Sequence, residues 1–140
     1  MKQMPIGELS KRAEVKVPTI RYYEQIGLMP AAERSDGNRR TYEQSDLNRL
    51  AFIRHARELG FEVDAIRTLL SLQDRPDHSC ASADVIAQAR LAEVNERIAG
   101  LTALKKELER MIGECAQGRV ADCRVIETLA DTSHDHGRLA

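Results

Sequence analysis

The stretch Val85–Cys115, VIAQARLAEVNERIAGLTALKKELERMIGEC, decides the fold of this 140-residue chain. Its apolar residues recur at steps of three and four positions, with Lys, Arg and Glu between them. This spacing predicts one long amphipathic helix with a heptad-like stripe, the kind that pairs with another helix, rather than a strand. The stripe is formed by Leu91, Val94, Ile98, Leu101, Leu108 and Ile112.

Cysteines flank this predicted helix. Cys80 precedes it, Cys115 ends it, and Cys123 follows after a short segment that contains Gly118. Because a helix rises about 1.5 Å per residue, Cys80 and Cys115 should lie about 50 Å apart within one chain. The two thiols can meet only where a second copy of the helix runs antiparallel to the first. In a reducing compartment, three cysteines are expected to be thiols or metal ligands rather than a disulfide framework.

The composition favours a soluble helical protein with a small core. Hydrophobic residues make up 42% of the chain and charged residues 31%, with two Phe, three Tyr and no Trp. Small cores often gain stability through dimerisation. The N-terminus has no apolar targeting segment and no run approaches membrane-spanning length, so we expect a cytoplasmic protein without a membrane partner.

Charge is unevenly distributed along the chain, although the net charge is only −1. Residues 11–57 contain ten Lys or Arg and six Asp or Glu, whereas residues 76–140 contain eight and eleven. The N-terminal half is therefore the better candidate for binding a polyanion such as nucleic acid.

Two short helices and a hairpin are predicted near the N-terminus. The first helix spans residues 6–13, and the second begins near Pro18, which suits a first turn, and ends at Gly27. Such a pair, joined by a tight turn, is a candidate helix-turn-helix. Residues 33–42 carry an Asp-Gly-Asn turn between short extended flanks, which predicts a β-hairpin with a basic second arm. A basic hairpin directly after a helix-turn-helix is a winged-helix arrangement.

Three further helices are predicted beyond the hairpin. Ser45 and Asp46 are expected to cap one that ends at Leu59, before Gly60. Another is expected over residues 63–72, followed by a polar linker. The third is a short amphipathic helix over residues 123–129. We expect the tail that follows it to be disordered.

Four segments, followed by the long helix, together resemble the MerR family of bacterial transcription regulators. They are Arg21-Tyr22-Tyr23-Glu24, Gly27-Leu28, Arg39-Arg40-Thr41-Tyr42 and Arg57-Glu58-Leu59-Gly60-Phe61. The resemblance covers residues 6–129 and departs from the family at Arg39, where relatives often have an aromatic residue. It implies a mainly α fold, with an N-terminal winged helix-turn-helix, a long antiparallel coiled-coil dimerisation helix and a short C-terminal metal-binding loop.

The resemblance also implies domain boundaries and a mode of action. The expected parts are a DNA-binding domain (4–73), a linker (74–80), a dimerisation helix (81–116), a metal-binding loop with a short helix (115–130) and a tail (131–140). In this family a homodimer binds a palindromic promoter with an overlong spacer. The effector-bound dimer bends and untwists the DNA so that RNA polymerase holoenzyme engages both promoter elements. Such indirect readout stabilises deformed DNA.

Carried over position by position, the resemblance identifies ten candidates for DNA contact, mostly through phosphates. Tyr22, by contrast, is expected on the inner side of its helix as a core residue. The ten candidates are Lys16, Thr19, Arg21, Tyr23, Arg34, Arg39, Arg40, Tyr42, Arg54 and Arg57.

The resemblance further implies that the three cysteines are effector ligands. In metal-sensing MerR relatives, a cysteine before the long helix marks sensors of divalent ions, whereas copper, silver and gold sensors have serine there. Cys80 therefore favours a divalent ion bound by Cys115 and Cys123 of one chain and Cys80 of the other, with two sites per dimer. Thiolate ligands select zinc, cadmium, lead or mercury.

The sequence leaves the identity of the ion open. Zinc usually takes four ligands, and zinc-sensing relatives carry an additional Cys beside the first loop Cys and a His in the loop. This chain has Glu114 and no loop His there, so a fourth ligand would have to be Asp122, His78, His134, His136 or water. The seven-residue loop also resembles that of copper sensors, so a monovalent copper or silver ion is an alternative effector.

Other classes of protein fit less well. A thiol-based redox regulator is the main alternative, although an iron–sulfur sensor should have four clustered cysteines. A sensor of organic ligands should have a larger domain after the long helix, and a coiled-coil adaptor would leave the basic hairpin unexplained. No H-E-x-x-H motif, Gly-rich phosphate loop or nucleophile elbow is present, so we expect no enzymatic activity.

Overall fold

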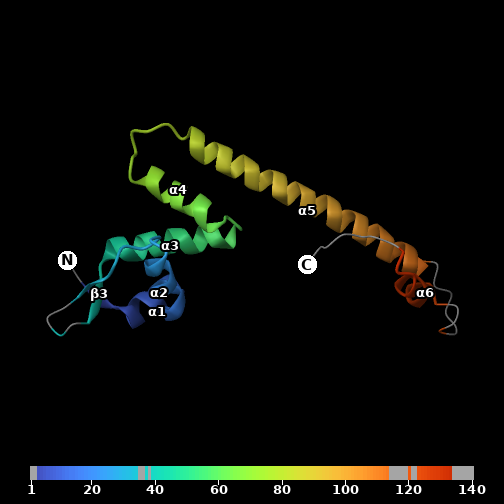
Figure 1. The fold of residues 1–140 in the computed structure, drawn as a ribbon, viewed down its shortest axis with the longest axis horizontal. Helices are drawn as coiled ribbons and strands as arrows, with labels where there is room; N and C mark the ends of the chain where they lie inside the picture. The colour runs from blue at the N-terminus through green and yellow to red at the C-terminus, as the bar shows by residue number, and fades with distance from the viewer. Residues whose placement is uncertain (1–2, 35–36, 38, 114–119, 121–122, 134–140) are drawn as a thin grey trace. The chain divides into compact units, whose positions relative to one another are not determined.

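The structure is a computed structural model that describes residues 3–34, 37, 39–113, 120 and 123–133. It divides into two compact units, residues 1–87 and 88–140. None of the helices in the described ranges is both long and apolar enough to span a membrane. The elements, shown in Figure 1, are β1 (Met4–Pro5), α1 (Ile6–Ala13), α2 (Val17–Gln25), β2 (Glu33–Arg34), β3 (Arg40–Tyr42), α3 (Gln44–Glu58), α4 (Val63–Gln73), α5 (Ala81–Gly113) and α6 (Arg124–Ala130).

Helices α1 and α2 form the predicted helix-turn-helix. Helix α1 ends at Ala13 and is capped by Glu14, which adopts a left-handed conformation with φ of 57° and donates its N–H to the Ser10 carbonyl. The Ser10 hydroxyl donates to the carbonyl of Val15 at 2.6 Å, and the Val15 side chain is buried. Pro18 lies in the first turn of α2, as expected from its lack of an N–H group. The turn is therefore held by local hydrogen bonds and by one apolar anchor.

The predicted basic hairpin is present, and a third strand joins it. Strands β2 and β3 are antiparallel, with Arg34 opposite Arg40. Strand β1 pairs with the other edge of β3, with Met4 opposite Tyr42, so the strand order is β1-β3-β2. Strand β1 is not among the elements predicted from the sequence. Because β1 immediately precedes α1, this pairing ties the wing to the first helix.

The start of α3 lies two residues before the predicted one. The N-cap is Glu43 rather than Ser45, because the Glu43 N–H donates to the Asp46 carboxylate at 2.8 Å. Such back-bonding satisfies a backbone group that helix geometry leaves without a partner. Helix α3 then ends before Gly60, whose φ of 85° suits glycine, and α4 follows as expected.

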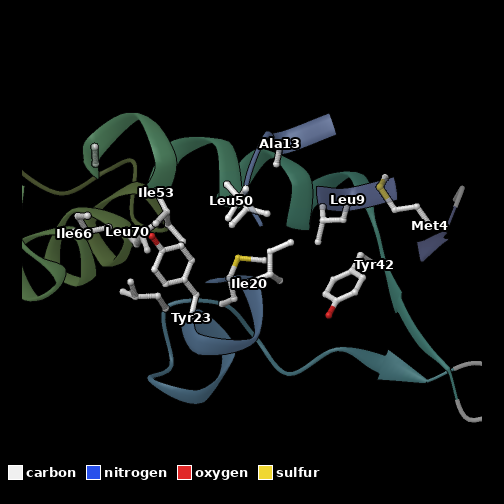
Figure 2. Packing of buried hydrophobic residues seen from close by; sticks show 14 residues of the cluster. Met4, Leu9, Ala13, Ile20, Tyr23, Tyr42, Leu50, Ile53, Ile66 and Leu70 are labelled. Carbon is white, nitrogen blue, oxygen red and sulfur yellow. The ribbon is translucent and has the colours of Figure 1, made fainter. Parts of the chain in front are cut away.

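One apolar cluster holds the first unit together (Figure 2). Leu50 and Ile53 of α3 are fully buried and pack with residues from the other helices, including Leu9 of α1, Ile20 of α2 and Ile66 of α4. Burying one side chain of this size contributes roughly 1.5–3 kcal/mol. Helix α3 therefore serves as the central element against which the helix-turn-helix is positioned.

The two adjacent tyrosines of α2 have the opposite placement from the predicted one. Tyr23 is buried, whereas Tyr22 is 51% exposed, so the expectation of a core Tyr22 is wrong. Ile20 and Tyr23 are three positions apart and share the inward face of α2, while Tyr22 is turned away from that face. The helical period, set by the buried Ile20, explains the difference.

Helix α5 is the long helix that the sequence predicts, with 33 residues. Its apolar side chains are largely exposed in the single chain. Beyond its end, α6 confirms the predicted short helix, and a groove of about 430 Å³ is lined by residues from both helices, among them Leu108 and Leu129. Cys115 lies outside the described residues. The exposed large apolar side chains on α5 are Val85, Leu91, Ile98, Leu101, Leu108 and Ile112.

Candidate nucleic-acid interface and cysteine positions

A groove of about 510 Å³ lies between α2 and the wing. Three of the predicted DNA-contacting residues line it: Arg21 of α2, Arg34 of β2 and Arg40 of β3. Glu24 is the acidic residue among the lining side chains, which otherwise include Gln25, Ala31 and Ala32. Guanidinium groups gathered around one concave surface are suited to phosphate oxygens, which they bind through paired N–H donors.

Glu24 connects α2 to the wing through three hydrogen bonds. The Tyr42 hydroxyl donates to Oε1 at 2.9 Å, and Arg40 Nη1 donates to the same oxygen at 3.4 Å. The backbone N–H of Ala32 donates to Oε2 at 3.1 Å. The Glu24 side chain is only 11% exposed, whereas that of Arg40 is 37% exposed. The carboxylate is thus held from inside the domain, and the guanidinium reaches towards solvent.

Tyr42 is a core residue, which corrects its prediction as a DNA contact. It is 1% exposed, and its ring lies among the apolar side chains of the cluster (Figure 2). Burial, together with the hydrogen bond to Glu24, raises the pKa of Tyr42 to about 12. The hydroxyl therefore stays protonated near neutral pH and remains a donor to the carboxylate.

Tyr23 requires the same correction, because it is 8% exposed and belongs to the core cluster. The error arose because two adjacent tyrosines follow Arg21 in the Arg21-Tyr22-Tyr23-Glu24 segment, and the family pattern does not say which tyrosine faces inwards. The exposed tyrosine of this pair is Tyr22.

The arginines of α3 already have partners within the domain. Arg54 Nη1 lies 2.7 Å from Glu14 and 3.4 Å from Glu58, and Arg57 Nη1 donates to the Phe61 carbonyl at 2.9 Å. Arg54 thereby links α3 to the turn between α1 and α2. Both retain further donors, so these contacts leave the prediction of DNA contact open. Of the other candidates, Lys16 and Arg39 are exposed and Thr19 is half-buried.

Two of the three cysteines occupy equivalent positions at helix starts. The Cys80 carbonyl accepts the Asp84 N–H at 3.0 Å at the start of α5, and the Cys123 carbonyl accepts the Glu127 N–H at 3.0 Å at the start of α6. Cys80 is exposed and Cys123 is half-buried. Each is therefore the N-cap residue of its helix, where the chain turns into the first helical turn.

The predicted metal ligands divide between the described residues and the rest of the chain. Cys115, Asp122, His134 and His136 lie outside the described residues, and His78 is exposed in the turn before α5. In the described ranges, no group of three or more His, Cys, Asp and Glu side chains is close enough to hold a metal ion. The donors themselves fit a soft divalent ion, because three thiols in one chain are the ligands that such ions prefer.

Sequence reasoning overlooked Glu24 as a residue of the site. The signal was available, because Glu24 is the one acidic residue between Lys16 and Glu33, a segment that also contains Arg21. A single carboxylate in a basic segment is expected to pair with a neighbouring cationic side chain. Its partners could not be identified without the fold, because Tyr42 and Arg40 are far away in the sequence.

The fold and the groove together define a regulator of the winged helix-turn-helix class. Residues 4–73 match the family model described as "MerR HTH family regulatory protein", and residues 47–111 match that described as "MerR, DNA binding". The chain belongs to the MerR family, whose members are transcriptional regulators and not enzymes.

Individual relatives cover almost the whole chain. It is 45% identical over 127 residues to the HTH-type transcriptional regulator ZntR of Escherichia coli (strain K12), and the aligned region covers 89% of this chain and 90% of that protein. It is 42% identical over 132 residues to the heavy metal-dependent transcription regulator 2 of Rhizobium meliloti, covering 93% and 88%. The crystal structure of PbrR691 from Ralstonia metallidurans in complex with lead(II) is similar, with a TM-score of 0.76, 39% identity and coverage of 90% and 98%.

Proposed function

We propose that this protein is a metal-responsive transcriptional activator that binds a palindromic promoter as a homodimer. A divalent thiophilic ion, either zinc, cadmium, lead or mercury, is the effector. Binding of the ion changes the promoter DNA so that RNA polymerase holoenzyme can start transcription of metal efflux or detoxification genes.

The DNA contact is proposed for α2 and the wing. Arg21, Arg34 and Arg40 share one groove. Two exposed residues add positive charge nearby in the chain: Lys16, directly before α2, and Arg39, directly before β3. Arginines that contact phosphates fix the register of a protein on DNA without reading its sequence. Specificity would then depend on how easily the promoter is bent and untwisted. Thr19, Arg54 and Arg57 are further proposed contacts.

The homodimer is supported by the apolar stripe on α5. Leu91, Ile98, Leu101 and Leu108 are 46–58% exposed in the single chain. Contiguous exposed apolar surface of this kind usually marks a binding surface, and a heptad-like stripe is suited to a second helix. Antiparallel pairing would bring the start of one α5 to the end of the other.

The single observation that carries the proposal is the position of Cys80 and Cys123 beyond opposite ends of α5. A helix of 33 residues is about 50 Å long. Ligands separated by such a helix can share an ion only across two chains. We therefore propose two sites per dimer, each built from Cys115 and Cys123 of one chain and Cys80 of the other.

The heavy metal-dependent relative and the lead(II) complex of PbrR691 support a metal effector for this chain. The ion would supply strong bonds to thiolates and would thereby cross-link the two subunits. A bound ion can shift the dimer towards its activating conformation only by binding that conformation more tightly than the inactive one. Asp122, His78, His134, His136 or water would complete a four-ligand site.

The proposal is tested by titrating the reduced dimer with Zn(II), Cd(II), Pb(II), Hg(II) and Cu(I) while counting free thiols. We expect one divalent ion to protect three thiols per chain, and Cys80→Ser to abolish induction in reporter cells while promoter binding is retained. The control variant Ser82→Ala, two residues further along, should respond as the wild type does. Induction by divalent ions that survives in Cys80→Ser would exclude the cross-subunit site, and binding of Cu(I) alone would favour the monovalent alternative.

A further inference from the structure

Glu24 occupies a position that the proposed DNA contact does not explain. It is an acidic residue in a groove lined by three arginines, where its charge alone would repel phosphate. Its side chain is nevertheless only 11% exposed and accepts hydrogen bonds from three donors, of which Arg40 and Tyr42 belong to β3 and Ala32 precedes β2. A carboxylate that repels phosphate and is nevertheless held by three hydrogen bonds within the domain is expected to have a role other than solubility.

The three hydrogen bonds differ in how readily they can be exchanged. Tyr42 is buried and its hydroxyl lies 2.9 Å from Oε1, and the Ala32 N–H lies 3.1 Å from Oε2. Arg40 is the most exposed partner and has the longest contact, 3.4 Å. Hydrogen bonds to oxygen weaken with distance, and solvent competes for exposed donors. Arg40 is therefore the partner that a phosphate can take over, while Tyr42 and Ala32 keep the carboxylate in place.

We propose that Glu24 is a positioning residue for DNA binding, which holds the Arg40 guanidinium at the mouth of the groove until a DNA phosphate replaces the carboxylate as its partner. This inference rests on the proposed function, because it assumes that the groove receives DNA. Ordering a long arginine side chain in advance reduces the entropy that must be lost on binding. The same carboxylate, through Tyr42, fixes the wing relative to α2.

Glu24→Gln tests the role of the charge with little change in shape. A glutamine retains the length of the side chain and one acceptor oxygen, but its amide nitrogen donates and cannot accept. It therefore cannot accept from Tyr42, Arg40 and Ala32 as the carboxylate does. A bystander acid and a positioning residue give opposite results, because removing a negative charge from a basic face otherwise strengthens binding to DNA.

The experiment measures binding of the full-length dimer to a duplex that the wild type has selected from a random-sequence pool. Glu24→Gln should weaken binding by roughly fivefold to tenfold, the size expected when one charge-assisted hydrogen bond is misplaced. Glu33→Gln, which removes the same charge from exposed β2, is the matched control and should bind equally well or more tightly. Tighter or unchanged binding by Glu24→Gln would overturn the inference while leaving the proposed function intact.

A double-mutant cycle separates positioning from general destabilisation. In the Arg40→Ala background, Glu24→Gln should lose most of its effect on DNA affinity, since Glu24 acts through Arg40. Equal effects in both backgrounds would contradict the inference. Tyr42→Phe, which keeps the ring in the core, provides a second test and should also weaken binding, with wild-type helix content in circular dichroism. If the wild type selects no duplex at all, both the proposed function and this inference are wrong.

Discussion

The hydroxyl of Tyr42, the buried residue of strand β3, donates a hydrogen bond of 2.9 Å to Glu24 in α2. This contact joins the wing to the second helix of the helix-turn-helix within the core of the first unit. The orientation of the wing is therefore determined by a polar contact with little access to solvent, where hydrogen bonds are stronger than at an exposed surface. Any change at either residue should affect both stability and the arrangement of the arginines.

Tyr42→Phe should destabilise the protein by about 1–2 kcal/mol at neutral pH, because the nearly buried Glu24 carboxylate loses a donor. Urea unfolding followed by circular dichroism measures this difference. Tyr22→Phe is the matched control, since Tyr22 is 51% exposed, and it should change stability by less than about 0.5 kcal/mol. Equal effects of the two substitutions would show that the hydroxyl contact has no energetic importance.

The raised pKa of Tyr42 predicts a specific loss of stability in alkali. The pKa of its hydroxyl is 10.0 in the reference state and about 12 in the fold. The folded state therefore holds this proton more tightly, so its contribution is fully present below pH 10 and is lost as the pH rises towards 12. The loss amounts to at most about 3 kcal/mol, at roughly 1.4 kcal/mol per pH unit. In Tyr42→Phe, the free energy of unfolding should decline less over this range, and curves parallel to the wild type would contradict the assignment.

Arg40→Ala should weaken binding to DNA and lower the slope of log affinity against log salt by about one, as expected for one lost phosphate contact. Titrations of a labelled duplex at several salt concentrations provide the slope. Arg75→Ala removes the same charge beyond α4 and should leave the slope unchanged. An unaltered slope in Arg40→Ala would mean that the wing arginine does not contact phosphate.

The proposed helix pairing predicts that Leu101→Lys raises the dissociation constant of the dimer at least about a hundredfold. Each of the two symmetry-related leucines should contribute roughly 1.5 kcal/mol or more. Analytical ultracentrifugation over a range of concentrations measures this constant. Ala103→Lys introduces the same charge two residues further on, away from the apolar stripe, and should leave the dimer intact. A dimer that is equally stable in both variants would exclude pairing through this stripe.

Much of the fold could be predicted from sequence because local signals agreed with the tertiary structure. Pro18 marks the first turn of α2, and Gly27, with a left-handed backbone, follows its end. Gly60, which also has a positive φ, follows the end of α3. The long apolar repeat predicted α5 as a single helix. Strand β1 could not be predicted in the same way, because two residues carry no periodic pattern and are defined only by pairing with β3.

The site was only partly predictable, for a related reason. The family pattern identified Arg21, Arg34 and Arg40, which the structure places around one groove. It did not distinguish exposed from buried tyrosines, since that depends on which face of α2 meets α3. The role of Glu24 depends on partners that only the hairpin brings near. Residue type and order predicted the cationic surface. Which tyrosines belong to the core and which are exposed could be seen only from burial in the folded domain.

Mixed dimers test the central claim that each metal site is shared between two chains. A dimer isolated with one Cys80→Ser chain and one Cys123→Ser chain retains a complete set of cysteines at one shared site. If the sites are shared, the mixed dimer should bind one Pb(II) or Cd(II) ion with wild-type affinity in the presence of a competing chelator, and neither parent homodimer should bind any. A mixed dimer that binds no ion under the same conditions would contradict the account, because sites formed within single chains would all be incomplete.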